Sequence, residues 1–297
     1  MDTKCVTFFS YKGGSGRTST ALNTLPYFAK ALYADKDSPI LLLDMDLDSA
    51  GMTYLLDMAD DFQKDGAYDV KDFLTGTPFS LDRAASIREQ SFGKKLLPVG
   101  KKLGLEDDEA VRFLGVNDTK VIDNSDLGEV DSVFNRLDIF CRDNAVRAVV
   151  LDSSTGTQPS AWASVEAANL VVMCLRATRQ FRIGTFNYLN LLKKKSLNKK
   201  ILLLPTVVPE VDMEIESKNQ RETAVDDILG RIKNDELKNI NTNFVAMGTL
   251  GINEVERFKW LEGVLYKIGQ EQMNSFRDDE KKAAERYKRL AQTIATE

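Results

Sequence analysis

The sequence predicts a doubly wound α/β domain, in which a mostly parallel sheet carries helices on both faces. Short apolar runs at 6–9, 40–43 and 148–151 are typical of buried strands. Each run ends in a polar or acidic segment, and apolar residues at helical spacing lie between the runs. A glycine-rich turn joins the first run to the first helical segment. We expect a single domain over residues 1–297 with at least six strand–helix units.

The glycine-rich turn lies in the stretch Ser10–Thr20, between the first strand and a helical pattern that starts at Ala21. Gly13, Gly14 and Gly16 lack a Cβ atom, so the main chain can approach an anion closely. Inward-pointing amides and the following helix N-terminus then favour a phosphate. A standard Walker A loop has Gly, four residues and Gly-Lys-Ser/Thr, whereas Arg17 replaces that lysine here.

Carboxylates follow two of the predicted strands. Asp44, Asp46 and Asp48 come after the run 40–43, and Asp152 comes directly after the run 148–151. Parallel strands present such side chains at one edge of the sheet, beside the glycine loop. The alternative is that these acids only solvate the turns, but three acids in five residues beside a phosphate loop favour a functional site.

These motifs resemble the deviant Walker A loop, Lys-Gly-Gly-x-Gly-Lys-Thr, of the ParA/MinD family of P-loop ATPases. The sequence is most similar to a branch of that family with Lys-Gly-Gly-x-Gly-Arg-Ser/Thr. Asp44 and Asp46 match the family's Asp-x-Asp motif, and the segment Asp152–Gly156 resembles its switch II segment.

The resemblance implies ATP or ADP and Mg²⁺ as ligands, slow ATP hydrolysis, and a homodimer held by ATP. It implies a role for Asp46 with the attacking water and a role for Lys12 across the dimer. Thr18, Asp44 and Asp152 would serve the metal. The implied nucleotide-binding residues are Lys12, Gly13, Gly14, Ser15, Gly16, Arg17, Thr18, Ser19, Pro205 and Thr206. The last two would approach the base, although the Asn of many relatives is absent there. Because a guanidinium is broader than an ammonium, Arg17 supports binding better than turnover.

Composition excludes several other classes of protein. There is no histidine, which excludes Ser-His-Asp and Cys-His catalysis and histidine-ligated zinc. The three cysteines are scattered and are expected to be buried apolar side chains. No apolar run is long enough to span a membrane, and the N-terminus does not resemble a signal peptide, so we expect a cytoplasmic protein. The net charge of −5 leaves DNA open as a partner but does not favour it.

The remaining segments are less specific. We expect a lid or insertion at about 104–127, helices at 223–238 and 257–269, and an edge strand at 243–247. A C-terminal helix at about 273–295 is expected to pack on the core and not to bind a membrane. Arg176, Arg179 and Arg182 follow a strand end, where they could contact a partner, an anion or DNA, or form a surface network.

Three functions are compatible with these features. The favoured one is an ATP-dependent switch that controls an unidentified protein partner or cargo. A nucleotide sensor or scaffold without hydrolysis is the second, and a module that positions cargo on DNA or a membrane is the third.

Overall fold

The computed structural model describes residues 1–76, 85–86, 90–122, 130–176, 179–195, 199–206, 244–246 and 278–297. Its described strands form one eight-stranded sheet in the order β3-β4-β2-β5-β1-β6-β7-β8. All neighbouring strands are parallel except β3 and β4, which pair antiparallel. The expected doubly wound, mostly parallel α/β fold is therefore confirmed.

The strands that form this sheet are β1 (Cys5–Ser10), β2 (Ile40–Met45), β3 (Leu97–Pro98), β4 (Val111–Leu114), β5 (Ala148–Thr155), β6 (Leu170–Leu175), β7 (Lys200–Pro205) and β8 (Phe244–Ala246). The described α-helices are α1 (Arg17–Ala31), α2 (Gly51–Leu55), α3 (Ala59–Phe62), α4 (Val70–Leu74), α5 (Val130–Asp143), α6 (Pro159–Ala167), α7 (Arg179–Lys194) and α10 (Asp278–Thr296). Short 3-10 turns occupy Gly93–Lys95, Lys101–Leu103 and Asp108–Ala110.

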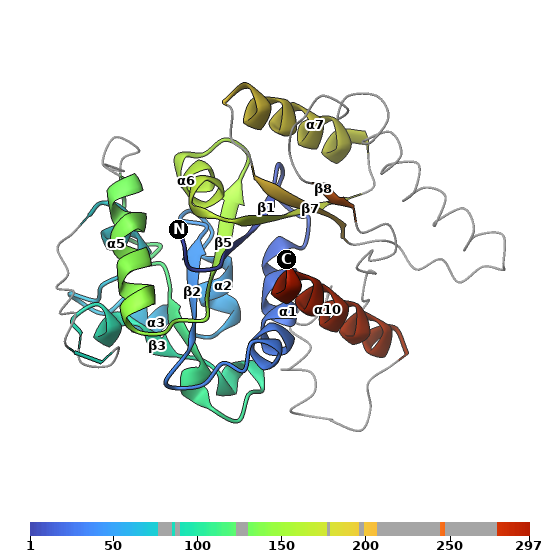
Figure 1. The fold of residues 1–297 in the computed structure, drawn as a ribbon. Coiled ribbons are helices and arrows are strands. Elements are labelled where there is room, and N and C mark those ends of the chain that lie inside the picture. Colours follow the sequence, from blue (N-terminus) through green and yellow to red (C-terminus); the bar gives the residue numbers. More distant parts are fainter. Residues whose placement is uncertain are drawn as a thin grey trace.

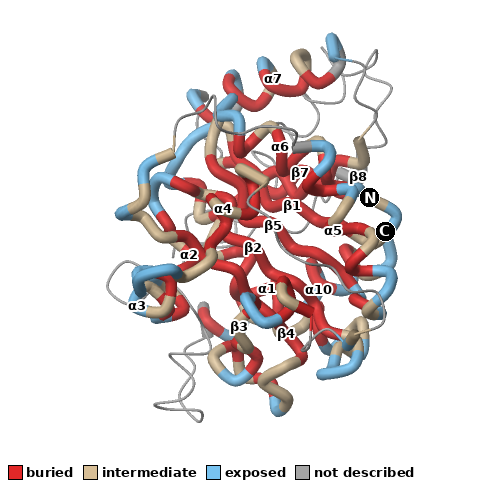
Figure 2. Tube along the Cα trace, turned by 90° about the vertical axis from the view of Figure 1, so that its left-hand side faces the viewer, coloured by how far each residue is buried: buried red, intermediate tan, exposed pale blue. Residues whose placement is uncertain are grey.

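Helices cover both faces of the sheet (Figure 1). Helices α1 and α10 pack together on one face, and α6 and α7 lie on the other. The sheet between them is buried along its central strands, while exposed residues gather on the loops and outer helix faces (Figure 2). Among the described residues, no helix combines the length and apolar character needed to cross a membrane.

Strand register places the functional segments side by side. Phe8 in β1 and Asp44 in β2 both pair with Asp152 in β5, so the phosphate loop and the two acidic strand ends share one edge. Every residue of β1 and β2 is buried, as the continuous apolar runs predict. The core therefore fixes the relative positions of the strand ends before any ligand is present.

Helix α10 packs against α1, as expected for the C-terminal helix; residues 273–277 of the predicted helix lie outside the described chain. Its buried stripe consists of Ala283, Tyr287, Leu290, Ala291 and Ile294. The Lys4 Nζ atom donates hydrogen bonds to the carbonyl oxygens of Ile294 and Ala295 at 2.9 and 2.8 Å. This lysine ties the C-terminal end of α10 to the start of β1.

The segment 104–127 differs from the expected lid or insertion, because its centre belongs to the sheet. Strand β4 is buried throughout and pairs with β2, with Ile40 opposite Val111 and Leu43 opposite Leu114. Arg112 interrupts its apolar pattern, and its guanidinium donates to the carbonyl of Leu96 at 2.8 Å. Strand β8 agrees with the expected edge strand, whereas the helices expected at 223–238 and 257–269 lie outside the described residues.

Candidate functional site

The phosphate loop leaves β1 and enters α1 through two left-handed glycines. Gly14 has φ +77° and Gly16 has φ +72°, a region that residues with a Cβ atom rarely adopt. Gly16 is the N-cap residue of α1, and its carbonyl accepts hydrogen bonds from the amide and hydroxyl of Thr20 at 2.9 and 2.7 Å. Lys12, Gly13 and Gly14 are exposed, so an anion can reach the loop from solvent.

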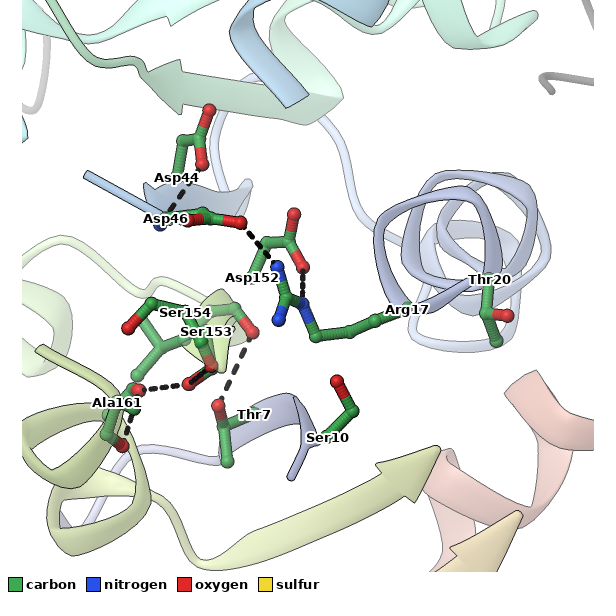
Figure 3. Close-up of polar contacts among 12 residues, drawn as sticks. Thr7, Ser10, Arg17, Thr20, Asp44, Asp46, Asp152, Ser153, Ser154 and Ala161 are labelled. Carbon is green, nitrogen blue, oxygen red and sulfur yellow. Dashed lines mark hydrogen bonds and ion pairs between the residues drawn. The ribbon is translucent and has the colours of Figure 1, made fainter. Parts of the chain in front are cut away.

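Arg17 connects the loop to two acidic strand ends (Figure 3). Its Nη2 atom lies 2.6 Å from Oδ2 of Asp46, and its Nε atom lies 3.0 Å from Oδ1 of Asp152. The exposed fractions are 6% for Arg17, 16% for Asp46 and 0% for Asp152. The guanidinium therefore neutralises both acids within a site that is largely closed to water.

The electrostatics of this trio follow from burial and pairing. Burial lowers the pKa of Arg17, but the charges of Asp152 and Asp46 and their hydrogen bonds more than offset it, so the net shift is upward. Burial raises the pKa of Asp152, opposed by the Arg17 charge and by a hydrogen bond with the Thr18 side chain. Oδ2 of Asp152 is buried and has no hydrogen-bond partner among the described residues. A buried carboxylate oxygen without a hydrogen-bond partner is suited to bind a cation, or a water molecule that the cation holds.

Asp44 points away from Arg17 and binds α2 instead (Figure 3). Its Oδ2 atom accepts hydrogen bonds from the amide and hydroxyl of Thr53 at 2.9 and 2.8 Å, and Oδ1 accepts from the amide of Asp46 at 3.2 Å. Burial, followed by the charge of Asp152, raises the pKa of Asp44 from 3.8 to about 7. The hydrogen bonds from Thr53 oppose that shift.

Serine hydroxyls support the main chain that follows Asp152. The hydroxyls of Ser154 and Ser160 lie 2.7 Å apart, and the Ser164 hydroxyl lies 2.9 Å from that of Ser153. Ser160 and Ser164 belong to α6, so these contacts attach the end of β5 to that helix. All four residues are buried, so these contacts hold the end of β5 against α6.

The remaining predicted residues are distributed along the same edge. Pro205 ends β7 opposite Leu175, and the amide of Thr206 donates to the carbonyl of Leu175 at 2.9 Å. The Thr206 hydroxyl is buried and has no partner among the described residues. Arg176 directly follows β6, whereas the side chains of Arg179 and Arg182 lie outside what the structure describes.

The structure thus brings Arg17, Asp46 and Asp152 together and places Thr18 beside them, while the Asp44 carboxylate faces α2. Lys12 is exposed and forms no ion pair with any described residue. Sequence reasoning missed Thr53, which holds Asp44 and accepts a hydrogen bond from the amide of Val116 at 3.0 Å. The only sign of Thr53 in the sequence is that it is a polar residue among apolar residues near the start of α2.

No protein-family model matches this sequence, and no curated protein matches it. Solved structures do match. MinD from Pyrococcus horikoshii in complex with Mg-ADP aligns over 98% of this chain and 96% of its own, with a TM-score of 0.57 and 16% identity. This chain has the fold of that MinD protein.

Two further solved structures share the fold. An Asp-to-Ala variant of McdA from Cyanothece in complex with ATP aligns over 98% of this chain and 96% of its own, with a TM-score of 0.59 and 13% identity. A plasmid partition protein from Borrelia burgdorferi bound to AMPPNP aligns over 97% of this chain and 98% of its own, with a TM-score of 0.60 and 15% identity. The ParA/MinD-like fold expected from the motifs is therefore confirmed.

Proposed function

We propose that this chain is an Mg²⁺-dependent ATP-binding switch, with slow hydrolysis and ATP-dependent dimerisation, that controls a protein partner or cargo. The observation that carries the proposal is the pairing of Arg17 with Asp46 and Asp152 directly behind an open glycine loop. A cation inside the loop and acids at the strand ends are the groups that phosphoryl transfer requires. Fold neighbours that hold Mg-ADP, ATP and AMPPNP support the same ligand class.

Nucleotide binding is assigned to the loop and to the end of β7. The amides of residues 13–18 would surround the phosphates, and the N-terminus of α1 would add its dipole. Arg17 would neutralise phosphate oxygens and can bind two at once. Pro205 and Thr206 would lie near the base, and the buried, unpaired hydroxyl of Thr206 is a group that a polar ligand atom would satisfy.

Arg17 would face two sets of partners once a nucleotide is bound, the two acids and the phosphate oxygens. In the structure its Nε and Nη2 atoms are committed to carboxylates at 3.0 and 2.6 Å. A guanidinium has five N–H donors, so it can also contact a phosphate, and we propose that this contact draws it away from Asp46, its more exposed partner. The acid that is released, Asp46, is the one with access to solvent, so it becomes available to orient or deprotonate a water molecule.

Mg²⁺ would supply charge neutralisation at the phosphates and a fixed set of ordered water molecules. The Thr18 hydroxyl and the unpaired Oδ2 of Asp152 are the groups that fit this ion, directly or through water. Asp44 was expected to serve the metal as well. Its carboxylate oxygens already accept hydrogen bonds from Thr53 and Asp46, which favours a supporting role.

Lys12 is proposed to act across a homodimer. It precedes the glycines and is exposed, whereas Arg17 is buried behind them, so the two cations face different surroundings. A second copy of this chain would place Lys12 at the partner's phosphates. ATP would then hold the dimer, and hydrolysis would release it.

Calorimetry with Mg-ATP and Mg-ADP tests nucleotide binding directly. Thr18→Ala should weaken the Mg²⁺-dependent affinity, and Asp46→Ala should keep binding but lose hydrolysis. Failure of the wild type to bind either nucleotide would overturn the proposal. Equal turnover in the Asp46→Ala variant would remove Asp46 from its assigned role.

The cross-dimer role has its own test. Lys12→Ala should bind ATP as a monomer but neither dimerise nor hydrolyse, as measured by light scattering and phosphate release. When it is mixed with Asp46→Ala, a hybrid dimer contains one site with an intact Asp46 in one subunit and an intact Lys12 in the other. About one active site per hybrid should reappear. Normal dimerisation of Lys12→Ala would make Lys12 a local phosphate ligand only.

A non-hydrolysing nucleotide sensor is the second candidate, and the commitment of Arg17 to both acids favours it. Phosphate release under single-turnover conditions separates the two. MinD and a plasmid partition protein among the fold neighbours also favour a positioning role for the switch. ATP-dependent retention on DNA or on liposomes, measured over a series of salt concentrations, tests that role.

A further inference from the structure

The ring of Tyr11 lies directly against Gly184, where the phosphate loop meets helix α7. A Cβ atom on Gly184 would lie 2.0 Å from Cδ1, 2.4 Å from Cε1 and 2.8 Å from Cγ of Tyr11. Carbon atoms that are not bonded approach to about 3.5–4.0 Å. The tyrosine ring therefore occupies the space that any side chain at position 184 would need, and Gly184 forms a notch for it.

This glycine is unfavourable for the helix that contains it. Gly184 lies in the interior of α7, which extends over 16 residues, and glycine is the least favourable residue there apart from proline. Its backbone is not in a left-handed conformation, so no turn requires glycine at this position. The contact with Tyr11 is a physical reason for a residue that weakens the helix.

Contacts of the main chain around Tyr11 also hold this residue in place. The amide of Gly156, just after β5, donates to the carbonyl of Ser10 at 3.2 Å. A Cβ atom on Gly156 would lie 3.5 Å from the carbonyl oxygen of Tyr11. The hydroxyl of Ser10 donates to the carbonyl of Lys12 at 3.0 Å. The residue that precedes the exposed loop is thus fixed between β5 and α7.

We propose that Gly184 is a positioning residue for the phosphate loop, because its notch seats Tyr11 and so sets where the loop begins. Strain at this contact would move the loop before it moves α7. The loop residues Lys12, Gly13 and Gly14 are exposed, whereas Gly184 is buried in a helix that packs against β6. The inference rests on the proposed function, since the loop it positions is the nucleotide-binding loop.

Gly184→Ala tests the notch, and hydrogen exchange of the nucleotide-free protein is the first measurement. Alanine favours the helix, so α7 itself should not be loosened. We expect faster exchange of the amides of residues 12–16, with no increase in α7. Asn187→Ala is the matched control, because it also raises helix propensity but lies on the exposed side of α7. It should leave exchange of the loop unchanged.

Calorimetry with Mg-ATP gives the second measurement. Gly184→Ala should bind about tenfold more weakly than the wild type, a factor that overpacking of a contact readily supplies. Tyr11→Ala should also bind more weakly, but adding Gly184→Ala to it should cause no further loss, because the ring is no longer there. This non-additivity identifies the contact itself.

The outcomes separate this inference from the proposed function. Wild type that binds no ATP would overturn the proposed function, and the exchange measurement would still decide the role of Gly184. If Gly184→Ala shows unchanged hydrogen exchange in the loop and wild-type affinity for Mg-ATP, Gly184 does not position the loop and the inference is overturned. The inference would also be overturned if Gly184→Ala lowered the affinity for Mg-ATP equally in the wild type and in the Tyr11→Ala variant. The effect would then not depend on the tyrosine ring.

Discussion

Arg17→Met should destabilise the nucleotide-free protein, because it removes the guanidinium that contacts both Asp46 and Asp152. Asp152 is fully buried and Asp46 is 16% exposed, and the variant leaves both without the Arg17 guanidinium. Removing one partner of a buried ion pair costs about 3–5 kcal/mol. We expect a loss of about 3 kcal/mol at neutral pH, at the low end of that range since Asp46 reaches solvent.

Urea denaturation with a chelator present measures this loss, and the slope against urea should not change. The pH dependence of the stability difference between wild type and Arg17→Met tests whether the loss is electrostatic. Burial raises the pKa of Asp152 and the Arg17 charge opposes that shift, so without Arg17 the acid takes up a proton at higher pH. The stability difference should therefore be largest at high pH and should shrink as the pH falls and Asp152 is protonated.

Arg17→Met/Asp152→Asn is the matched control. It removes one of the two unpaired charges, so it should recover a large part of the lost stability. Arg17→Lys should fall between wild type and Arg17→Met, because an ammonium cannot reproduce the separate Nε and Nη2 contacts to two acids. If Arg17→Met is as stable as the wild type from pH 5 to 8, the ion pairs do not hold the site and the argument fails.

Three further predictions follow from other residues. Burial raises the folded-state pKa of Asp44 to about 7, so its contribution to stability should be present below pH 4 and lost as the pH rises toward 7. Asp44→Asn should therefore reduce the pH dependence of the free energy of unfolding, measured by urea denaturation without divalent cations. Burial raises the pKa of Cys5 and Cys174 to about 12, so iodoacetamide at pH 8 should label them only on unfolding, and rapid labelling of folded protein would contradict their placement. Lys4→Met should cost about 1 kcal/mol and speed hydrogen exchange in the last turn of α10, because two carbonyl groups lose their cationic donor; unchanged exchange there would contradict the contact.

The parts of the site that sequence predicted are those determined by local patterns. A glycine loop between strand and helix has few alternative structures, and an acid after a buried parallel strand can only emerge at the carboxyl edge. The register that pairs Phe8 and Asp44 with Asp152 follows from three adjacent strands, of which β1 and β2 are buried throughout and β5 is buried except at its last residue. The helix α10 stripe could also be predicted, because a 3.6-residue period needs no knowledge of its partner.

Features that depend on distant partners could not be predicted in this way. Strand β4 was missed because Arg112 breaks its apolar run, and the structure satisfies that charge with the Leu96 carbonyl and the Glu109 carboxylate, 2.7 Å away. The two carboxylate partners of Arg17 could likewise not be predicted, since both phosphates and carboxylates attract a guanidinium. The Tyr11–Gly184 contact joins residues far apart in the chain, and neither one carries a local signal of the other.

The three acids of the site, which look equivalent in the sequence, have different contacts in the structure. Asp46 and Asp152 meet Arg17, but the Asp44 carboxylate accepts two hydrogen bonds from Thr53 and so ties α2 to the end of β2. Helix α2 begins at Gly51, where a Cβ atom would lie 3.7 Å from the Thr18 hydroxyl oxygen. By holding α2, Asp44 therefore places the start of that helix beside the hydroxyl proposed for Mg²⁺. Its contribution to a metal site would then be made through the position of α2, and replacing it would disturb Thr18 without removing a ligand.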